Sequence, residues 1–146
     1  MASFDAGEFG GALFHATDGS HEWELLANEV HVQDLSLCGS VFLAAGGLTH
    51  RGTRDGAALL IQLDKRGQWE VRQVFATSQA VPRITGRTQI TPNWRDGKTE
   101  PLWVITLHDA VDGEKGKAAF GISMEGSVHY LGELEKGEPK PMEPAK

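Results

Sequence analysis

The sequence predicts an all-β protein made of repeated antiparallel hairpins, and three observations support this prediction. Short apolar runs of strand length alternate with glycine-containing turns along most of the 146-residue chain. No segment combines a helical spacing of apolar residues with helix-capping residues at its ends. A pattern of strand, acidic turn and strand recurs three times, and such recurrence indicates a repeat architecture.

The repeat is visible in three segments that align without a gap. They are "GALFHATDGSHEW" (11–23), "AALLIQLDKRGQW" (57–69) and "AAFGISMEGSVHY" (118–130). In each segment an acidic residue is followed five positions later by an aromatic residue. The three pairs are Asp18 and Trp23, Asp64 and Trp69, and Glu125 and Tyr130.

Each copy of the repeat predicts one hairpin. The turn glycines, Gly19, Gly67 and Gly126, can adopt backbone conformations that other residues rarely adopt. The acidic side chain can accept hydrogen bonds from the amides of its turn, and the aromatic ring can pack back over that turn. We therefore expect a structural role for these residues, with the three rings in equivalent positions of successive sheets.

The remaining strands are predicted from the apolar runs between the hairpins. The segments "VFLAAGGLTHRG" (41–52) and "LWVITLHDAVDG" (102–113) are apolar runs that end in a glycine-containing turn. Upstream of the first lies "EVHVQDLSLCG" (29–39), which also predicts a strand. Its apolar residues are Val30, Val32, Leu35 and Leu37. Upstream of the second lies "RITGRTQITPNW" (83–94), which alternates less clearly.

These elements predict a single domain over residues 1–136. It begins with a hairpin (10–27), followed by a four-stranded unit (29–75) and a second four-stranded unit (81–135). Residues 137–146 are charged and proline-rich, which predicts a flexible tail.

The turns resemble the Asp-box, or BNR, motif of sialidase-like β-propellers, which is roughly S/T-x-D-x-G-x-x-W. "ATDGSHEW" and "QLDKRGQW" match it at the aspartate and the tryptophan. "SMEGSVHY" matches it at Ser123, with Glu125 and Tyr130 as conservative replacements. The resemblance implies an incomplete β-propeller-like array of about two and a half four-stranded antiparallel blades. Closed propellers have roughly four to eight blades, so the terminal strands are expected to be exposed edges unless other segments cover them.

Composition and charge argue against several classes of function. A formal net charge of -6, without a cluster of lysine and arginine, argues against a nucleic-acid surface. No apolar run approaches roughly 18 residues, so no membrane span is predicted. The only cysteine, Cys38, lies in the apolar run "LSLCGSVFL", which predicts a buried and inert thiol.

The sequence carries no convincing catalytic signal. The six histidines show no metal-binding spacing such as H-x-x-x-H. His108 and Asp109 are neighbours in a predicted strand, so their side chains are expected to point to opposite faces. We therefore expect no metal, no cofactor and no catalytic residue, and hence a protein that is not an enzyme.

The best candidate for a binding site is an insertion in the second four-stranded unit. From Trp69 to Leu102 is 33 positions, whereas the equivalent interval from Trp23 to Val41 is 18. The additional residues fall within Ala76–Pro101, and insertions in repeat proteins often mark the binding face. The candidate partner-binding residues in this insertion are Ser78, Gln79, Arg83, Arg87 and Trp94.

A second candidate is the polar hairpin tip Leu48–Gly56, which contains His50 and Arg51. Arginine and tryptophan are frequent anchors of protein interfaces. The alternatives are a solvated turn at this tip and, for the insertion, a long surface loop that packs Trp94 on the sheet edge.

As a whole, the chain resembles an immunity protein of the type VI secretion system that blocks a peptidoglycan amidase effector. The resemblance rests on size, all-β repeats, a partial propeller and acidic charge. It implies a periplasmic protein whose leader is removed before "ASFDAG", and a protein partner that is a cell-wall amidase toxin. It also implies that a serine-bearing loop plugs the Cys/His pair of the amidase. Ser78 is the candidate serine, with Gln79, Arg83 and Trp94 as supporting contacts.

The alternative function is a glycan- or peptide-binding module without an enzyme target. The opening "MASFDAGEFGG" lacks the charged and apolar regions of a signal peptide, so a cytoplasmic location is the alternative to the periplasm. The oligomeric state is left open, including self-association that completes a ring.

Overall fold

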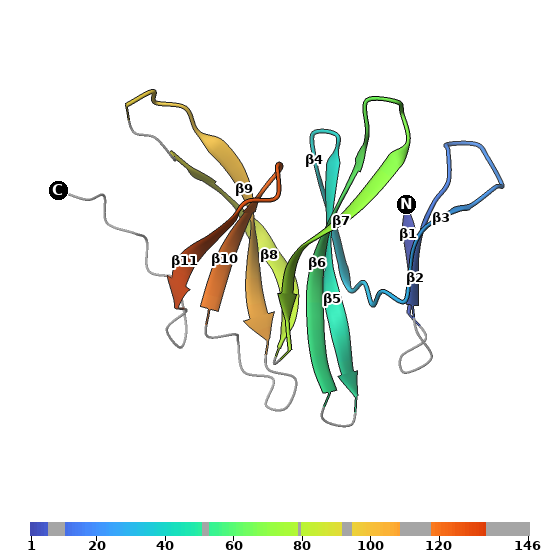
Figure 1. Ribbon diagram of the computed structural model, residues 1–146, viewed down its shortest axis with the longest axis horizontal. Helices are drawn as coiled ribbons and strands as arrows, with labels where there is room; N and C mark the ends of the chain where they lie inside the picture. Colours follow the sequence, from blue (N-terminus) through green and yellow to red (C-terminus); the bar gives the residue numbers. More distant parts are fainter. Residues whose placement is uncertain (6–10, 51–52, 79, 92–94, 109–117, 134–146) are drawn as a thin grey trace.

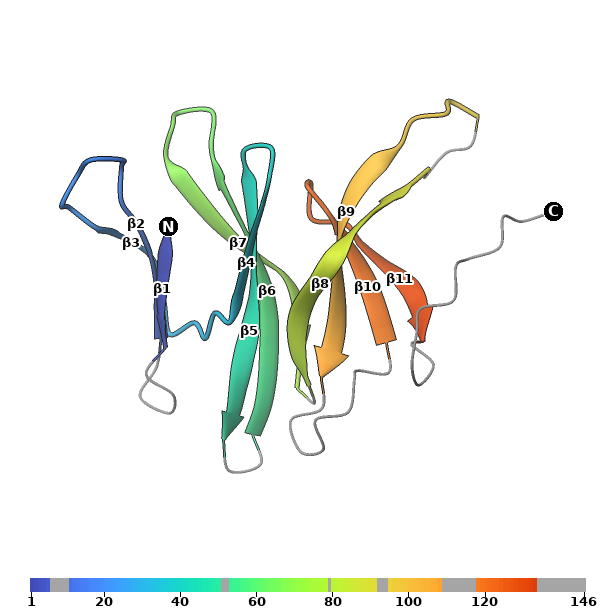
Figure 2. The ribbon, with the colours of Figure 1, turned by 180° about the vertical axis from the view of Figure 1, so that it is seen from behind.

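Three antiparallel β-sheets make up the molecule. The computed structural model describes residues 1–5, 11–50, 53–78, 80–91, 95–108 and 118–133. Every regular element in these residues is a β-strand, which confirms the all-β prediction. The three sheets follow one another in chain order, with the second sheet in the middle (Figure 1, and from behind Figure 2).

The first sheet has three strands and the other two have four each. The first sheet contains β1 (Ala2–Asp5), β2 (Gly11–His15) and β3 (Glu24–Asn28). The second sheet contains β4 (Asp34–Cys38), β5 (Val41–His50), β6 (Thr53–Leu63) and β7 (Trp69–Thr77). The third sheet contains β8 (Val81–Ile90), β9 (Glu100–His108), β10 (Ala118–Ser123) and β11 (Val128–Glu133).

Both four-stranded sheets are simple meanders. Each strand is hydrogen-bonded to the strand that follows it in the chain, in the orders β4-β5-β6-β7 and β8-β9-β10-β11. All of these pairings are antiparallel. The turns β2–β3, β4–β5, β6–β7 and β10–β11 therefore lie at one end of the sheets, called here the turn end, and the β7–β8 connection lies at the other, the connection end.

The two central strands of the second sheet, β5 and β6, are buried on both of their faces. Core cluster 1 packs one face against the third sheet, through side chains such as Leu43, Leu60 and Trp103. Core cluster 2 packs the other face against the first sheet, through Leu13 and Ile61. Neighbouring residues of a strand point to opposite faces of the sheet. Where both faces are buried, consecutive residues must therefore all be apolar. This explains why β5 and β6 contain continuous apolar runs rather than an alternating pattern.

The turns β6–β7 and β10–β11 have the same hydrogen-bonded structure. In the first, the Gly67 amide donates to the Asp64 carbonyl (3.0 Å) and the Asp64 amide to the Gln68 carbonyl (2.7 Å). In the second turn, the Gly126 amide donates to the Ser123 carbonyl (3.0 Å) and the Ser123 amide to the Ser127 carbonyl (3.0 Å). Both glycines have positive φ, at 77° and 92°. This is a three-residue hairpin loop closed by a glycine in the left-handed region.

A side chain stabilises each of these two turns from the same position. The Asp64 carboxylate accepts from the Arg66 amide (2.7 Å) and the Gln68 amide (2.9 Å). The Ser123 hydroxyl accepts from the Ser127 amide (3.0 Å). The structural counterpart of Asp64 is therefore Ser123 and not Glu125. The gapless alignment of the third copy is wrong by two residues.

This shift also changes the aromatic positions. Trp69, the first residue of β7, packs beside His15 with ring centroids 4.7 Å apart, and so lies between two sheets. The shift makes Val128 its counterpart, and Tyr130 is instead 61% exposed beside Phe120. Trp23 precedes β3 and is 57% exposed. The prediction that the three rings are equivalent is therefore wrong.

Three further differences concern the N-terminal half. Strand β1 (Ala2–Asp5) was not among the predicted strands, and it pairs with β2. The strand predicted over 29–39 begins only at Asp34, because the linker 29–33 crosses from the first sheet to the second. Cys38 is partly buried against core cluster 1 rather than fully buried. The predicted tail, 137–146, lies outside the described residues.

Candidate functional site

The predicted insertion is not a single loop. Residues Val81–Ile90 form β8, the first strand of the third sheet. Part of the extra length lies in the strands, because β7 and β8 have nine and ten residues, whereas β3 and β4 have five each. Another part lies between β8 and β9, which nine positions separate (91–99), whereas two positions separate β4 and β5 (39–40). The expectation of one enlarged loop within Ala76–Pro101 is therefore wrong, and its candidate residues are distributed along a strand and both of its ends.

Ser78 is exposed at the connection end, between β7 and β8. It directly follows Thr77, the last residue of β7, and β8 begins at Val81, which is 3% exposed. The hydroxyl of Ser78 makes no hydrogen bond with any other described residue. The strand ends thus present this serine to solvent from a well-anchored position, while Gln79 lies outside the described residues.

Arg83 joins two sheets. Its Nε and Nη2 atoms donate to the two carboxylate oxygens of Asp34 on β4, at 2.6 and 3.0 Å. The same carboxylate accepts from the backbone amide of Ile84 at 3.0 Å. The hydrogen bond to Asp34 is the main cause that raises the pKa of Arg83 above its ordinary value. The guanidinium group is therefore engaged within the chain, although Arg83 was predicted as a partner-binding residue.

Arg87 makes a second link between the same sheets. Its Nη2 atom donates to the carbonyl oxygen of Leu37 and to the hydroxyl of Ser36, the latter at 3.3 Å. The indole Nε1 of the buried Trp103 also donates to this hydroxyl, at 3.1 Å. Like Arg83, Arg87 uses its hydrogen-bonding groups to hold β4 against the third sheet. The sequence patterns had singled out neither Asp34 nor Ser36.

The other predicted site residues do not converge on Ser78 as one loop. Trp94 and Arg51 lie outside the described residues, and the side chain of His50 is not described. The strand ends that flank Trp94 are at the turn end, opposite to Ser78, whereas β5 ends at His50 at the connection end. Topology therefore brings His50 and Ser78 to the same end of the second sheet.

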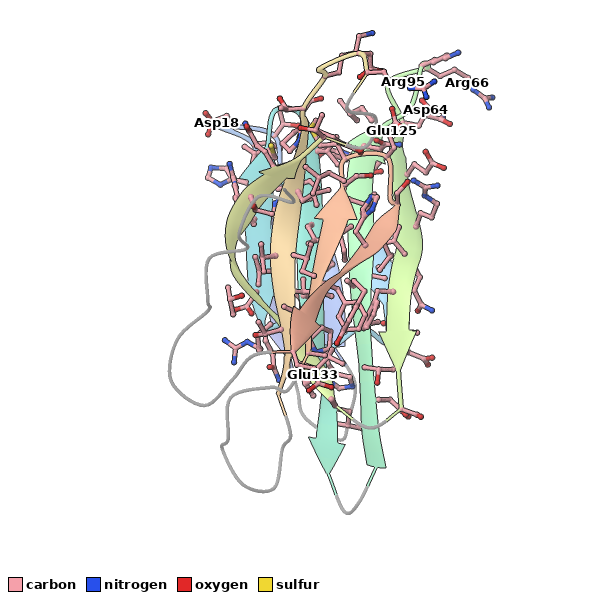
Figure 3. All side chains as sticks on the ribbon, turned by 90° about the vertical axis from the view of Figure 1, so that its left-hand side faces the viewer. Asp18, Asp64, Arg66, Arg95, Glu125 and Glu133 are labelled. Carbon is pink, nitrogen blue, oxygen red and sulfur yellow. The ribbon has the colours of Figure 1, made fainter. Side chains whose placement is uncertain are left out.

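Charged side chains of both signs gather at the turn end, as Figure 3 shows. They are Asp18, Asp64, Arg66, Arg95 and Glu125. Arg66 and Asp64 form an exposed ion pair with a 3.6 Å separation. Because the side chain of Arg66 is largely exposed, this ion pair contributes little to stability.

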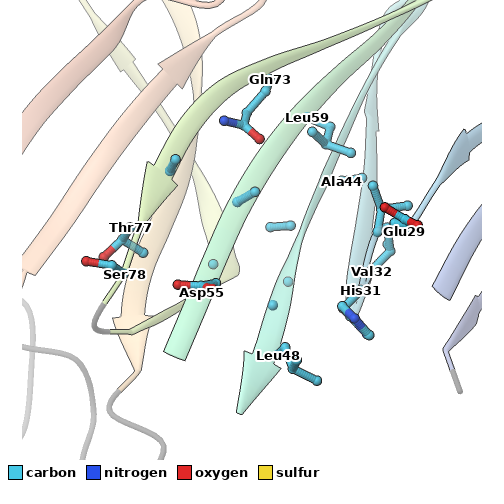
Figure 4. A pocket seen from close by; sticks show the side chains of 17 residues that line it. Glu29, His31, Val32, Ala44, Leu48, Asp55, Leu59, Gln73, Thr77 and Ser78 are labelled. Atoms are coloured by element: carbon cyan, nitrogen blue, oxygen red, sulfur yellow. The ribbon is translucent and has the colours of Figure 1, made fainter. Parts of the chain in front are cut away.

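A groove of about 570 Å³ lies at the connection end, on the face of the second sheet that is turned toward the first sheet (Figure 4). Strands β5, β6 and β7 make its floor, and the linker Glu29–Val32 makes one wall. The linker crosses β5 at Gly46, where a Cβ atom would overlap the carbonyl oxygen of His31. Ser78 is among the residues that line the groove.

The floor of the groove is apolar and its rim is polar. Small or buried side chains, including Ala44, Ala57 and Leu59, form the floor, and their size leaves the space open. The polar side chains around them are Glu29, His31, Asp55, Gln73, Thr77 and Ser78. A volume of this size, with an apolar lining and a few polar groups, is typical of small-ligand sites.

Glu29 has an unusual backbone conformation. Its φ of 57° makes it the one residue other than glycine with positive φ in the described part of the chain. A left-handed conformation costs such a residue roughly 1–2 kcal/mol. The amide of the next residue, Val30, donates to the carbonyl of Gly11 at 3.1 Å. This bond to the first sheet helps to hold the linker, and with it the wall of the groove, in place.

Among the described residues, no group of three or more His, Cys, Asp and Glu side chains is arranged to hold a metal ion. The side chain of His108 and the whole of Asp109 are outside what the structure describes. The structure describes no helix long and apolar enough to cross a bilayer.

Comparisons of the chain with protein-family models, with curated proteins and with solved structures found no match. The sequence patterns also missed most of the polar groove residues, namely Glu29, His31, Asp55, Gln73 and Thr77. They are far apart in the sequence and only folding brings them together, so no local spacing could have identified them.

Proposed function

We propose that this protein is an immunity protein that binds a secreted peptidoglycan amidase and blocks its active-site cleft. The observation that carries the proposal is the placement of Ser78. Its exposed side chain stands on a short connection between two long strands, beside a groove. Rigid presentation lowers the entropy cost of binding, which suits a protein that inserts one residue into an enzyme.

We further infer that the three sheets are successive blades of an incomplete propeller. Two features support this inference. The two four-stranded sheets have the same meander order, and their outermost hairpins share one hydrogen-bonded turn. Propeller blades are four-stranded antiparallel sheets of this type. The first sheet, with three strands, then corresponds to a partial blade.

Within this proposal the roles of the predicted residues change. Ser78 remains the group that enters the partner's cleft. Arg83 and Arg87 support it indirectly, because they fix β8 to β4 and so hold the connection that carries Ser78. His50 is the last residue of β5 and Arg51 follows it in the sequence, which keeps both as candidates for secondary contacts with the partner.

The test begins with capture of the partner by the immobilised protein from a periplasmic extract, followed by inhibition assays with the purified amidase. Ser78→Glu should weaken inhibition roughly 100-fold, about 3 kcal/mol, because the new carboxylate would be buried without a partner. Ser40→Glu, at an exposed position of the turn end, is the matched control and should inhibit normally. Equal inhibition by the two variants would remove Ser78 from the interface.

A glycan- or peptide-binding function is the second candidate, and the groove favours it. In that case a small ligand should saturate the groove in the absence of an enzyme partner. Capture of a hydrolase, with stoichiometric loss of its activity, supports the first candidate. Saturable binding of a peptidoglycan fragment, without any effect on a hydrolase, supports the second.

A further inference from the structure

We propose that the groove beside Ser78 receives a basic side chain, arginine or lysine, from the protein partner. This inference rests on the proposed function, because it specifies the chemistry of the partner that the function requires. It goes beyond that function by assigning a second contact, separate from the serine, to a defined set of residues. The argument uses the charge, the floor and the size of the groove.

The charge of the groove is negative. Two carboxylates, Glu29 and Asp55, line it from the linker and from β6, whereas none of its lining residues is a lysine or an arginine. Neither carboxylate forms an ion pair with another described residue. Concave surfaces with low-dielectric walls concentrate the field of their charges, so the groove favours a cation.

The floor suits the stem of a long basic side chain. The half-buried Ala57 and the buried Ala44 and Leu59 line an apolar floor between the polar rims. Lysine and arginine bury their aliphatic stems on such surfaces while the charged head stays near solvent. A guanidinium group can in addition donate hydrogen bonds to Gln73 or Ser78 through its several N–H groups.

The size and position of the groove also fit this occupant. A volume of about 570 Å³ exceeds the needs of a single ion and accommodates a side chain together with part of its backbone. The groove adjoins Ser78, so a partner that covers the serine also covers the groove mouth. The net charge of -6 provides a long-range attraction for a basic surface.

The test uses a titration of the isotope-labelled full chain with two peptides, followed by NMR. The probe is acetyl-Gly-Arg-Gly-amide, and its control carries citrulline, which has nearly the same shape as arginine but no charge. The arginine peptide should shift the amide signals of Gly46, Gly56 and Ser78, and should bind at least about tenfold more tightly than the citrulline peptide.

Matched variants assign the effect to the groove. Glu29→Gln combined with Asp55→Asn should weaken binding of the arginine peptide by about tenfold or more. Glu24→Gln combined with Glu125→Gln changes the net charge equally at the turn end and should leave binding unchanged. If the double groove variant does not fold, the single variant Asp55→Asn replaces it in the test. This variant should also bind the arginine peptide more weakly than the wild type does.

Several results would overturn the inference. They are equal binding of the arginine and citrulline peptides, the absence of shifts at millimolar peptide, and an unchanged affinity of the groove variants. Saturation of the groove by a neutral chitooligosaccharide in place of the arginine peptide would also overturn it, in favour of a glycan site. The titration contains no amidase, so the two proposals are tested separately. A negative titration would not contradict the role of Ser78 in inhibition. A failure to inhibit the amidase would not contradict a positive titration.

Discussion

The carboxylate of Asp34 on β4 lies 2.6 Å from the Nε atom of Arg83 on β8, so one ion pair joins the second sheet to the third. The same carboxylate accepts the amide of Ile84, on the open edge of β8. A single side chain therefore both links two sheets and satisfies a backbone donor that no strand pairs.

The two members of this pair should contribute unequally to stability. Asp34→Ala leaves the part-buried amide of Ile84 without its acceptor, and we expect a loss of about 2 kcal/mol in the free energy of unfolding. Arg83→Ala removes only a partly exposed ion pair, and we expect a loss of about 0.5 kcal/mol. Urea unfolding of the single and double variants measures both values and their coupling. Equal losses for the two single variants would contradict this assignment.

The pH dependence of the pair follows from the raised pKa of Arg83. A cationic group whose pKa is higher in the folded than in the unfolded state stabilises the folded protein. The stabilisation is complete when the pH is below the pKa of the unfolded state, and it is lost only as the pH rises through the pKa of the folded state. The stability difference between the wild type and Arg83→Ala should therefore be constant from about pH 6 to 10.

Lysine provides the contrast for this prediction. Arg83→Lys places a group with an ordinary pKa of roughly 10.4 at the same position, so part of its contribution should disappear as the pH approaches 11. Thermal unfolding across the pH range compares the three proteins. A wild-type contribution that falls between neutral pH and pH 10 would be inconsistent with a pair that depends on this arginine.

The two equivalent turn glycines should differ in their tolerance of alanine. Both have positive φ, so each substitution costs about 1 kcal/mol from the backbone alone. A Cβ atom on Gly67 meets nothing within 4 Å. On Gly126 it would lie 2.8 Å from the Nη2 of Arg72 and 2.9 Å from the Cγ1 of Val74.

Gly126→Ala should therefore lower the free energy of unfolding by about 1 kcal/mol more than Gly67→Ala, because of this crowding. It should also disturb the hydrogen bond from Arg72 to the Glu125 carbonyl, which now spans 2.5 Å. Chemical denaturation gives the difference, with Gly67→Ala as the internal reference. Identical losses would show that the turn does not pack against β7 as described.

Gly46 should be essential to the wall of the groove. Alanine there would overlap the His31 carbonyl oxygen, and the linker would have to move, at a cost of about 1–3 kcal/mol or more. Gly86 is the matched control, since a Cβ atom there meets nothing within 4 Å. Thermal unfolding should separate the two variants, and NMR shifts of Gly46→Ala should concentrate in the linker 29–33. A neutral Gly46→Ala would argue against the close crossing.

The hairpins could be predicted from the sequence because their signals are local. A strand, a glycine-containing turn and a second strand occupy some thirteen consecutive residues, and period and turn chemistry suffice to recognise them. The position of Ser123 could not be recognised in this way. The equivalence of Ser123 and Asp64 is defined by backbone hydrogen bonds, whereas a gapless sequence alignment pairs Asp64 with Glu125.

The site was less predictable, because its contacts are long-range. Asp34 and Arg83 are 49 residues apart in the sequence, and nothing in either local pattern indicates that they pair. The sequence indicates a binding loop in the polar, arginine-containing segment Ala76–Pro101, whereas Arg83 and Arg87 of this segment donate hydrogen bonds to β4. Among the residues that the structure describes, Ser78 alone is both a predicted contact and an exposed residue of the groove rim.

The burial of β5 and β6 on both of their faces has a consequence for how the chain folds. Core cluster 1 contains Leu43 and Leu60 from the second sheet and Trp103 and Ile105 from the third. Neither of these sheets therefore forms a complete hydrophobic core without the other. A fragment that ends after β7 would leave half of this interior in water. The repeated sheets are thus structural units that do not fold independently. We expect thermal unfolding of the protein in one cooperative transition and not in a separate transition for each sheet.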